Sequence, residues 1–350
     1  MNLVKPFINI KILGAATALP KVTPLTNLDI FNLHPLTKLL PDLVKNRLAQ
    51  SIVSQYGYTQ RYMIRTPGKL VNEIEASSET LAKECVQNAF KQASKNIDFF
   101  IHGTTTTTRY SGSQATAVLH TINQKSPAIE MKAGCSTSLA SLYMGISTLA
   151  LGHKNVMVNC AETLSKLVNP TVKETWFGLA DASAALWLEK SEQETQSDFK
   201  VLGMIFGTNG EHVDMYTTQG KLPPNQKDMD EFGYTLSGNG SKLKSLAQEH
   251  YKLMFSEFKK EFGSELENIS YVIPHQVNFS LVKNIIKKNF NLPNATILRD
   301  SDQIGNVGGS SVLFTLVQSI QKKSFKKGDK ILLMSVGGGL TYCMQLWEKV

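Results

Sequence analysis

The sequence predicts an α/β protein made of two similar halves, and two observations carry this prediction. Short, almost continuously apolar runs alternate with longer segments of helical character, a pattern typical of buried strands covered by helices. The same order of runs then recurs. The strand starting at Ile97 has a counterpart at Ile269 and the strand starting at Asn155 has one at Lys330, so the offsets are 172 and 175 residues. Two offsets this similar favour a duplicated α/β unit.

The first half is expected to span residues 1–189. Its helices are expected at 78–93 and 136–151, and its strands at 8–14, 97–102, 155–160 and 184–188. The helix over 136–151 carries small and apolar residues nearly all round, which indicates burial. Residues 25–60 do not fit the repeat, and we expect them to form a mostly helical insertion.

The second half is expected to span residues 190–350, after a polar crossover at 190–198. Its helices are expected at 243–262 and 310–322, and its strands at 199–205, 269–273, 330–335 and 342–347. Residues 207–234 indicate a second insertion at the surface. Because the strands are nearly continuous apolar runs, we expect the sheets to be largely parallel.

The composition indicates a globular protein with a substantial core. The chain has 350 residues, of which 42% are hydrophobic. No apolar run approaches the roughly 18 residues of a membrane helix, and the first residues lack the features of a secretory signal. Four scattered cysteines without a CxxC pair indicate reduced thiols in a cytoplasmic protein. The net charge of +8 favours an acidic partner, although ordinary surface lysines explain it equally well.

The sequence contains no recognisable motif for binding nucleic acid, nicotinamide, flavin or metal. Five histidines show no ligand spacing with cysteines or carboxylates: His102, His120, His153, His212 and His250. We therefore expect no metal, no cofactor, no nucleic-acid partner and no membrane partner.

Three turns marked by glycine or proline each place one chemically capable side chain beside an apolar run. The segments are 133–138, 273–278 and 305–311, and the side chains are those of Cys135, His275 and Asn306. A thiol, an imidazole and a carboxamide at three strand ends suggest a nucleophile, a base and an orienting group, which need proximity in space rather than in sequence. Taken alone, Cys135 is more simply a buried thiol and His275 a loop or core histidine.

The position of each side chain suggests its chemistry. Cys135 stands where a loop becomes a helix, so unpaired backbone N–H groups and the helix dipole are expected to favour its thiolate. A nearby His275 can take the thiol proton, and the amide of Asn306 can donate hydrogen bonds to a developing enolate or carbonyl oxygen. Such a site suits thioester exchange onto the cysteine, followed by attack of a carbon or heteroatom nucleophile.

These motifs resemble those of the β-ketoacyl-(acyl carrier protein) synthase III family. The matching segments are Pro-His-Gln-x-Asn at 274–278, Gly-Asn at 305–306 and Gly-Gly-Gly-x-Thr at 337–341, with the small-residue turn before Cys135. They occur in the family's order, and the resemblance runs from about Tyr56 to the C-terminus. It implies the thiolase fold, with duplicated five-stranded mixed-sheet halves in a layered α-β-α-β-α arrangement.

The resemblance also implies roles for the motif residues. Cys135 would be acylated. His275 and Asn306 would stabilise the thioester carbonyl and the enolate that forms when a malonyl thioester loses carbon dioxide. The backbone N–H groups of Cys135 and Gly339 would form the oxyanion hole.

A threonine-rich loop at 104–113 resembles a family segment that reaches the acyl channel of the partner subunit in a homodimer. On this resemblance Thr108, Arg109 and Ser111 are expected to bind substrate, together with Phe177. Ser111 stands where a bulky aromatic residue often narrows the channel, which implies a roomier acyl pocket. The simpler alternative is that the threonines only form a β-rich strand end.

Lysines that follow the His275 motif form a candidate carrier-binding face. Lys287 and Lys288 match a basic pair of the family, and Lys283 shares a helix face with Lys287. The alternative is an ordinary solvated lysine face. Residues 25–60 lack the tryptophan that stacks on the coenzyme A adenine in typical members, which favours an acyl carrier protein over coenzyme A as the donor.

The leading hypothesis is a homodimeric condensing enzyme in fatty-acid or specialised-metabolite biosynthesis. It would move an acyl group onto Cys135 and join it to a malonyl-type thioester with loss of carbon dioxide. Two alternatives stay open: transfer of the acyl group to an oxygen or nitrogen nucleophile without decarboxylation, or a non-catalytic partner of another synthase. The presence of Asn306 favours condensation, and the presence of all three motif residues argues against a non-catalytic role.

Overall fold

The computed structural model describes residues 1–67, 76–169, 172–220, 223 and 225–350. A mixed sheet runs through the molecule in the strand order β12-β11-β13-β14-β8-β1-β7-β6-β4-β5. The N-terminal strands are β1 (Ile8–Ala18), β4 (Phe99–Gly103), β5 (Ala128–Met131), β6 (Asn155–Thr163) and β7 (Asp181–Ser191). The C-terminal strands are β8 (Phe199–Thr208), β11 (Ile269–Pro274), β12 (Thr296–Ile297), β13 (Lys330–Gly337) and β14 (Thr341–Lys349).

The two halves of this sheet repeat one another. Each half contributes five neighbouring strands, and the halves meet where β1 pairs with β8. In one half β4 lies between the parallel strands β5 and β6, as β11 lies between β12 and β13 in the other. The predicted domain boundary falls inside β7, because the crossover that joins the halves covers residues 192–198. The division of the chain into two domains stays a prediction.

The expectation of largely parallel sheets was wrong. The outer pairs are parallel, but the five central pairs, from β6–β7 through to β14–β13, are antiparallel. Continuous apolar runs report that a strand is buried on both faces. Here helices cover the antiparallel strands too, so hydrophobic patterning could not reveal strand direction.

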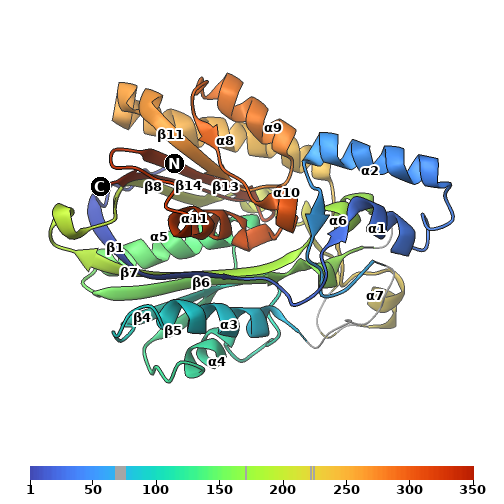
Figure 1. Cartoon of the computed structure of the whole chain (residues 1–350), viewed down its shortest axis with the longest axis horizontal. Helices are drawn as coiled ribbons and strands as arrows, with labels where there is room; N and C mark the ends of the chain where they lie inside the picture. Colours follow the sequence, from blue (N-terminus) through green and yellow to red (C-terminus); the bar gives the residue numbers. More distant parts are fainter. Residues whose placement is uncertain (68–75, 170–171, 221–222, 224) are drawn as a thin grey trace.

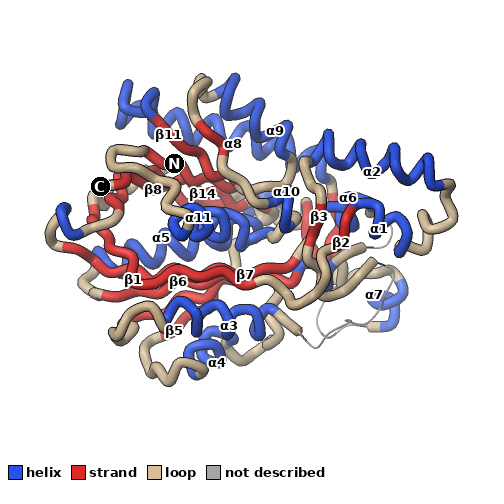
Figure 2. Tube along the Cα trace, in the orientation of Figure 1, coloured by secondary structure: helices blue, strands red, loops and turns tan. Residues whose placement is uncertain are grey.

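Helices and the two half-sheets form five layers (Figure 1, Figure 2). The N-terminal half-sheet is covered on its outer face by α3 (Ser78–Phe90) and α4 (Gln114–His120). Between the half-sheets lie α5 (Thr137–Ala150) and α11 (Ser311–Gln321). The outer face of the C-terminal half-sheet is covered by α8 (Gly240–Phe262) and α9 (Phe279–Asn284). This arrangement confirms the layered fold class.

The central helix α5 is buried on nearly every side, as its composition predicts. It packs closely on β6 because Gly145 carries no side chain: a Cβ there would lie 2.8 Å from a methyl carbon of Val158. The start of this helix therefore has a fixed position relative to the strand ends.

Residues 25–60 form the mostly helical insertion that was predicted. It contains α1 (Asn27–Leu33) and α2 (Asp42–Tyr56), bracketed by the paired short strands β2 (Leu25–Thr26) and β3 (Gln60–Arg61). The buried Arg61 donates to the carbonyl oxygen of Phe177 at 3.0 Å, which joins the insertion to α6 (Lys173–Gly178).

The remaining elements lie outside the main sheet. They are β9 (Tyr216–Thr218), α7 (Gln226–Asp230), β10 (Leu236–Gly238) and α10 (Ser301–Ile304). In the part of the chain that the structure describes, no helix has the length and apolar content needed to cross a membrane.

Candidate active site

Cys135 lies in a tight turn at the start of the buried helix α5. The turn is the 3-10 helix η1 (Gly134–Ser136), which runs directly into α5. Gly134 has a φ of +53°, and a Cβ there would lie 2.6 Å from the carbonyl oxygen of Gly338. Both the left-handed backbone and the close contact therefore require glycine. The turn holds Cys135 against the residues that follow β13.

His275 follows β11 at the same edge of the sheet. Its backbone N–H donates to the carbonyl oxygen of Met334 at 2.7 Å, which continues the parallel pairing of β11 with β13. At the end of β13, a Cβ on Gly337 would lie 2.5 Å from the backbone nitrogen of Cys135. One strand thus contacts both the histidine segment and the cysteine turn.

Asn306 is held by its backbone beside the start of β7. Its N–H donates to the carbonyl oxygen of Gly178 at 2.7 Å, and its own carbonyl accepts from the N–H of Ala180 at 2.9 Å. The side-chain Oδ1 accepts from the N–H of Gly308 at 2.9 Å, which sets the orientation of the amide. Its Nδ2 has no acceptor among the described residues, so it is available to donate.

The three motif segments close a ring of contacts. His275 Nδ1 lies 2.8 Å from the hydroxyl oxygen of Ser311, in the segment that follows the asparagine. In the same segment, a Cβ on Gly309 would lie 3.0 Å from the carbonyl oxygen of Gly134. The structure therefore brings together three segments that the sequence connects only by their chemistry.

The thiol of Cys135 is protonated at neutral pH. Burial, with a smaller contribution from the carboxylate of Glu162, raises its pKa to about 12, and a backbone hydrogen bond from Gly338 opposes this shift. The expectation that the helix N-terminus favours the thiolate was therefore wrong for the free protein. A helix N-terminus contributes about 0.3–1 kcal/mol, which is less than the cost of removing a charged group from water.

The imidazole of His275 is neutral at the same pH. Burial lowers its pKa to about 4. Its Nδ1 is occupied by Ser311, whereas its Nε2 is buried with no hydrogen-bond partner among the described residues. If Ser311 donates to Nδ1, then Nε2 carries the proton and acts as a donor; if Ser311 accepts, Nε2 acts as an acceptor. The direction of the hydrogen bond with Ser311 therefore determines whether Nε2 of His275 acts as a donor or as an acceptor.

Glu162 is a buried carboxylate near the cysteine turn that the sequence analysis missed. It lies in β6, is 1% exposed, and accepts hydrogen bonds from the N–H of Thr105 at 2.9 Å and the hydroxyl of Thr106 at 2.8 Å. Burial raises its pKa to about 7, although these hydrogen bonds oppose the shift. Gly309 leaves room for it, because a Cβ there would lie 2.8 Å from Oε1. No sequence pattern indicated this role, because a single glutamate at the end of a strand matches no motif.

The glycine turn after β13 presents Gly338 to the thiol. The backbone hydrogen bond that lowers the pKa of Cys135 comes from Gly338. Gly339 follows with a φ of +125°. The role of Gly339 in an oxyanion hole stays a prediction.

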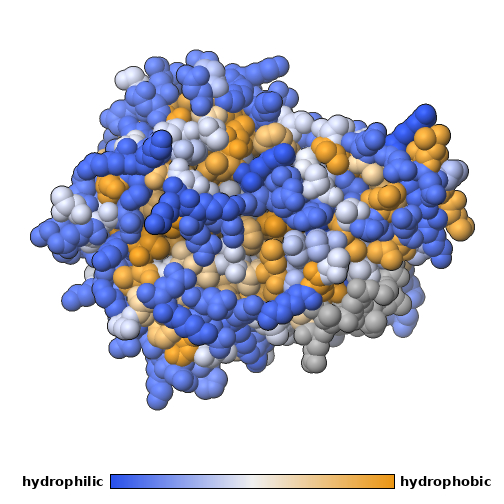
Figure 3. Space-filling model, in the orientation of Figure 1, coloured by the Kyte–Doolittle hydropathy of each residue, from blue (hydrophilic) through white to orange (hydrophobic). Residues whose placement is uncertain are grey.

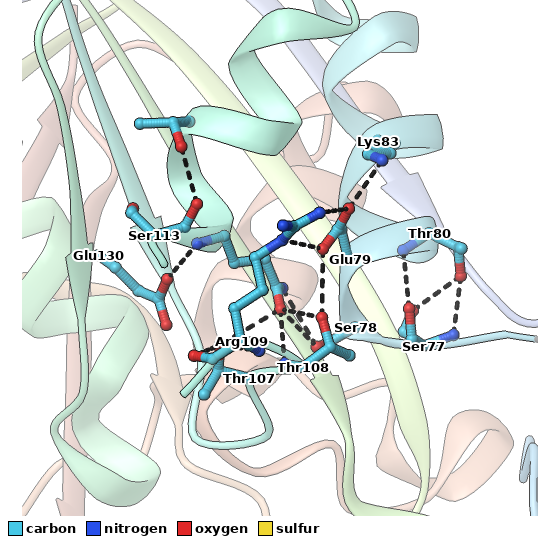
Figure 4. A network of polar contacts seen from close by, with 12 residues as sticks. Ser77, Ser78, Glu79, Thr80, Lys83, Thr107, Thr108, Arg109, Ser113 and Glu130 are labelled. Carbon is cyan, nitrogen blue, oxygen red and sulfur yellow. Dashed lines mark hydrogen bonds and ion pairs between the residues drawn. The ribbon is translucent and has the colours of Figure 1, made fainter. Parts of the chain in front are cut away.

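Thr108 and Arg109 of the threonine-rich loop direct their side chains toward Glu79 of α3 (Figure 4). Arg109 Nε and Nη2 bind the carboxylate of Glu79 at 2.8 and 3.1 Å, and Thr108 Oγ1 donates to it at 3.2 Å. Arg109 and Lys83 hold the pKa of this carboxyl at about 2. Ser111 is exposed. Within the described part of a single chain, these contacts do not bring Thr108, Arg109 or Ser111 into the cysteine turn.

Phe177 lies beside the asparagine segment. It precedes Gly178, whose carbonyl oxygen accepts the N–H of Asn306. Its ring packs on Phe31 of α1 with 4.5 Å between ring centroids, and the residue is 5% exposed. Phe177 therefore links the insertion to one wall of the site.

The expected carrier-binding lysines differ in their availability. Lys283 and Lys288 are exposed. Lys287 instead donates to the carbonyl oxygens of Pro293 and Ala295, at 2.7 Å for Ala295, so its ammonium group is committed to a neighbouring loop.

A surface cavity of about 390 Å³ lies between α2, α8 and α9. Gln55, Lys244 and Asn278 are among its lining residues, and Asn278 belongs to the His275 motif. The cavity therefore lies beside the candidate site rather than on the cysteine turn. In the described residues, no group of three or more histidine, cysteine, aspartate or glutamate side chains could hold a metal ion.

Comparisons with known proteins agree with this geometry. Two models of one family match the chain, "3-Oxoacyl-[acyl-carrier-protein (ACP)] synthase III" at residues 129–210 and its C-terminal part at residues 260–349. The chain is 27% identical over 299 residues to a beta-ketoacyl-[acyl-carrier-protein] synthase III of Clostridium perfringens, covering 83% of this chain and 88% of that protein. It is 29% identical over 286 residues to the enzyme of that name from Clostridium kluyveri, covering 78% and 84%.

Solved structures show the same fold. The 3-oxoacyl-[acyl-carrier-protein] synthase III of Aquifex aeolicus superposes with a TM-score of 0.80 at 24% identity, covering 97% of this chain and 99% of that chain. The priming beta-ketosynthase of the R1128 polyketide pathway superposes with a TM-score of 0.80 at 15% identity, covering 99% and 98%. The family models span both halves of the duplicated unit, and each contains one part of the candidate site. The chain belongs to the 3-oxoacyl-(acyl-carrier-protein) synthase III family.

Proposed function

We propose that this protein is a condensing acyltransferase that forms an acyl-cysteine on Cys135 and extends it with a malonyl-type thioester. One observation carries the proposal: the cysteine turn, His275 and the Asn306 segment converge, and Nε2 of His275 is buried with no hydrogen-bond partner among the described residues. A thiol beside two neutral hydrogen-bond donors matches the needs of both half-reactions.

In the first half-reaction, Sγ of Cys135 attacks the carbonyl carbon of an acyl thioester. The bond between that carbon and the donor sulfur breaks, and the proton of the thiol leaves with the departing donor thiol. The carbonyl oxygen becomes negative in the transition state, and we assign its stabilisation to the backbone N–H of Cys135 with Gly338 or Gly339. Because the thiol is protonated at rest, deprotonation contributes to the barrier of this step.

In the second half-reaction, a malonyl thioester loses carbon dioxide. The bond to the carboxylate carbon breaks, and its electron pair forms an enolate whose oxygen needs donors. Asn306 Nδ2 and the Nε2–H of His275 supply them. The enolate carbon then attacks the acyl carbon, and the sulfur of Cys135 leaves as a thiolate and takes up one proton from water.

This role requires one tautomer of His275. Nε2 must carry the proton, so Nδ1 must accept the hydrogen bond from the hydroxyl of Ser311 at 2.8 Å. Burial keeps the ring neutral at physiological pH. His275 then acts as a donor to the enolate rather than as the base that the sequence analysis considered.

We propose an acyl carrier protein as a thioester partner and a second copy of the chain as its structural partner. Lys244, which lines the surface cavity, and the exposed Lys283 and Lys288 suit an acidic carrier surface. The edge strand β5 and the exposed Tyr110 of the threonine-rich loop suit contact with a second copy.

The sedimentation mass of the full chain tests the homodimer, and a monomer at micromolar concentration would contradict it.

Intact-protein mass spectrometry tests the acyl-cysteine directly. The protein is mixed with a panel of acyl-CoA and acyl-carrier thioesters, and we expect a mass gain on wild type and on the Cys85→Ala control but none on Cys135→Ala. Cys85 is a suitable control because it is a buried thiol on α3, outside the site.

The same experiment separates the alternatives. Loss of the adduct with carbon dioxide release on adding a malonyl thioester supports condensation. An adduct that persists until an alcohol or amine is added favours simple acyl transfer. Absence of an adduct with every donor in the panel would overturn the proposal and leave the non-catalytic partner as the better explanation. An adduct that forms equally on Cys135→Ala would overturn the assignment of the nucleophile to Cys135.

Ser311→Ala is expected to slow condensation by about tenfold or more, because the proton-bearing Nε2 of His275 is no longer favoured. Acylation of Cys135 in the same variant should stay near the wild-type rate. Ser311→Thr keeps the hydroxyl and should recover condensation. The neighbouring Ser310→Ala, which removes only a 3.4 Å hydrogen bond to Ala182, is the matched control. Equal loss of both half-reactions would show a structural role instead.

Glu162→Gln is expected to make Cys135 more reactive by moving its pH dependence to lower pH. The wild-type carboxyl ionises as the pH rises through about 7 and then disfavours the nearby thiolate. The amide keeps the shape without the charge, so the rate of alkylation by iodoacetamide should rise by roughly three- to tenfold above neutral pH. Glu192→Gln at an exposed site serves as the control. A profile that does not move would show that Glu162 does not act on the thiol.

A further inference from the structure

Helix α2 exposes several aliphatic side chains that a surface helix would normally bury, whereas its Ala49 and Ile52 pack against the core. Lys45 is its buried residue, with the side chain 7% exposed and the ammonium group 3.6 Å from Asp42. Leu43, by contrast, is 65% exposed, and Val44 and Leu48 also face solvent. A solvent-facing helix normally buries its aliphatic side chains and exposes its lysines. Exposed aliphatic side chains in this number indicate that something else covers them.

The loop between α1 and α2 extends the same apolar surface. Leu36 is 69% exposed and Leu39 is 87% exposed. Of the exposed large hydrophobic residues among the described ones, seven lie between residues 33 and 53: Leu33, Leu36, Leu39, Leu43, Val44, Leu48 and Val53. We call this set the leucine tip. Exposed apolar residues scattered singly need no explanation, but a cluster of this kind does.

The leucine tip lies at one end of the longest axis of the molecule (Figure 1). Figure 3 shows apolar side chains gathered there, over α2 and the loop that joins it to α1. The loop projects outward, and its leucines line neither the surface cavity between α2, α8 and α9 nor the small cavity beside Phe279. A projecting apolar surface fits a soft, flat partner better than a protein ligand that needs a groove.

The exposed charged side chains between residues 36 and 48 are two cations and one carboxylate, that of Asp42, which is 91% exposed. Lys38 and Arg47 are exposed, and neither has an ion-pair partner among the described residues. The nearby Asp42 faces the buried Lys45 at 3.6 Å, which partly neutralises it. Leucines flanked by unpaired cations complement an acyl-chain boundary that lies under anionic headgroups.

We propose that the leucine tip docks this protein on the surface of an anionic phospholipid bilayer. Leu36, Leu39 and Leu43 enter the boundary between headgroups and acyl chains, and Lys38 and Arg47 contact the phosphates. The expectation of no membrane partner rested on the absence of a spanning segment, and a peripheral contact needs none. The proposal does not depend on the proposed chemistry, since it uses no residue of the site.

The position of the leucine tip suits an enzyme that handles acyl chains. The tip includes the N-terminal end of α2, whereas Ser54 and Gln55 near the other end of the helix line the surface cavity beside the His275 motif. A helix of 15 residues spans about 22 Å. Docking through Leu36, Leu39 and Leu43 would therefore hold the surface cavity up to about one helix length from the lipid surface.

Co-sedimentation of the full chain with lipid vesicles tests the proposal. Wild type is mixed with vesicles of phosphatidylcholine, or of phosphatidylcholine with phosphatidylglycerol, and we expect binding to the anionic vesicles. The triple variant Leu36→Gln, Leu39→Gln, Leu43→Gln should bind at least about tenfold more weakly. Lys38→Gln with Arg47→Gln should lose the preference for phosphatidylglycerol. Leu151→Gln is the matched control, because Leu151 is 86% exposed at the distant end of α5.

Each outcome is decisive. Absence of wild-type binding to both kinds of vesicle would overturn the proposal, as would equal binding by the triple variant and wild type. If the triple variant instead loses binding to an acidic carrier protein, or loses self-association in sedimentation velocity, the leucine tip is a protein interface and the lipid proposal fails. Circular dichroism and the thermal midpoint of each variant establish that the fold is intact, since exposed substitutions change stability little.

Discussion

The candidate site depends on backbone contacts at positions where no side chain fits. Gly134, Gly309 and Gly337 each come so close to another segment that a Cβ would lie within 3.0 Å of a backbone atom. Two of these glycines belong to the C-terminal half and one to the N-terminal half, so the contacts join the halves at the cysteine turn. Because backbone packing tolerates little displacement, the nucleophile and its two companions have fixed positions before any substrate arrives.

The second property of the site is its low charge at rest. The thiol is protonated and the imidazole neutral, both because burial disfavours the charged form. Hydrogen-bond donors in such surroundings act strongly on a charge that appears only during reaction. Glu162 is the exception, since its pKa of about 7 lets it change charge near neutral pH. The same buried carboxylate holds Thr105 and Thr106, so it joins the threonine-rich loop to the region of the thiol.

The sequence predicted the duplicated fold, the insertion and the convergence of three motif segments, because each left a regular or chemically distinctive pattern. It did not reveal strand direction, since apolar runs report burial alone. It also missed Ser311 and Glu162, whose roles arise from contacts 36 and 57 residues away along the chain. Lys287 was expected to face a partner, but its ammonium group caps a neighbouring loop. Such contacts depend on side-chain direction, which spacing along one helix does not determine.

The roles of Cys135 and of the enolate donors His275 and Asn306 can be separated by measuring the carbon dioxide released from a malonyl thioester in the absence of any acyl donor. We expect Cys135→Ala to retain this release, because the donors to the enolate are His275 and Asn306. Adding Asn306→Ala should lower it by about a hundredfold, the usual cost of removing one such donor. Release that disappears in Cys135→Ala, or that survives unchanged when Asn306 is replaced, would contradict the assignment of the enolate to these two residues.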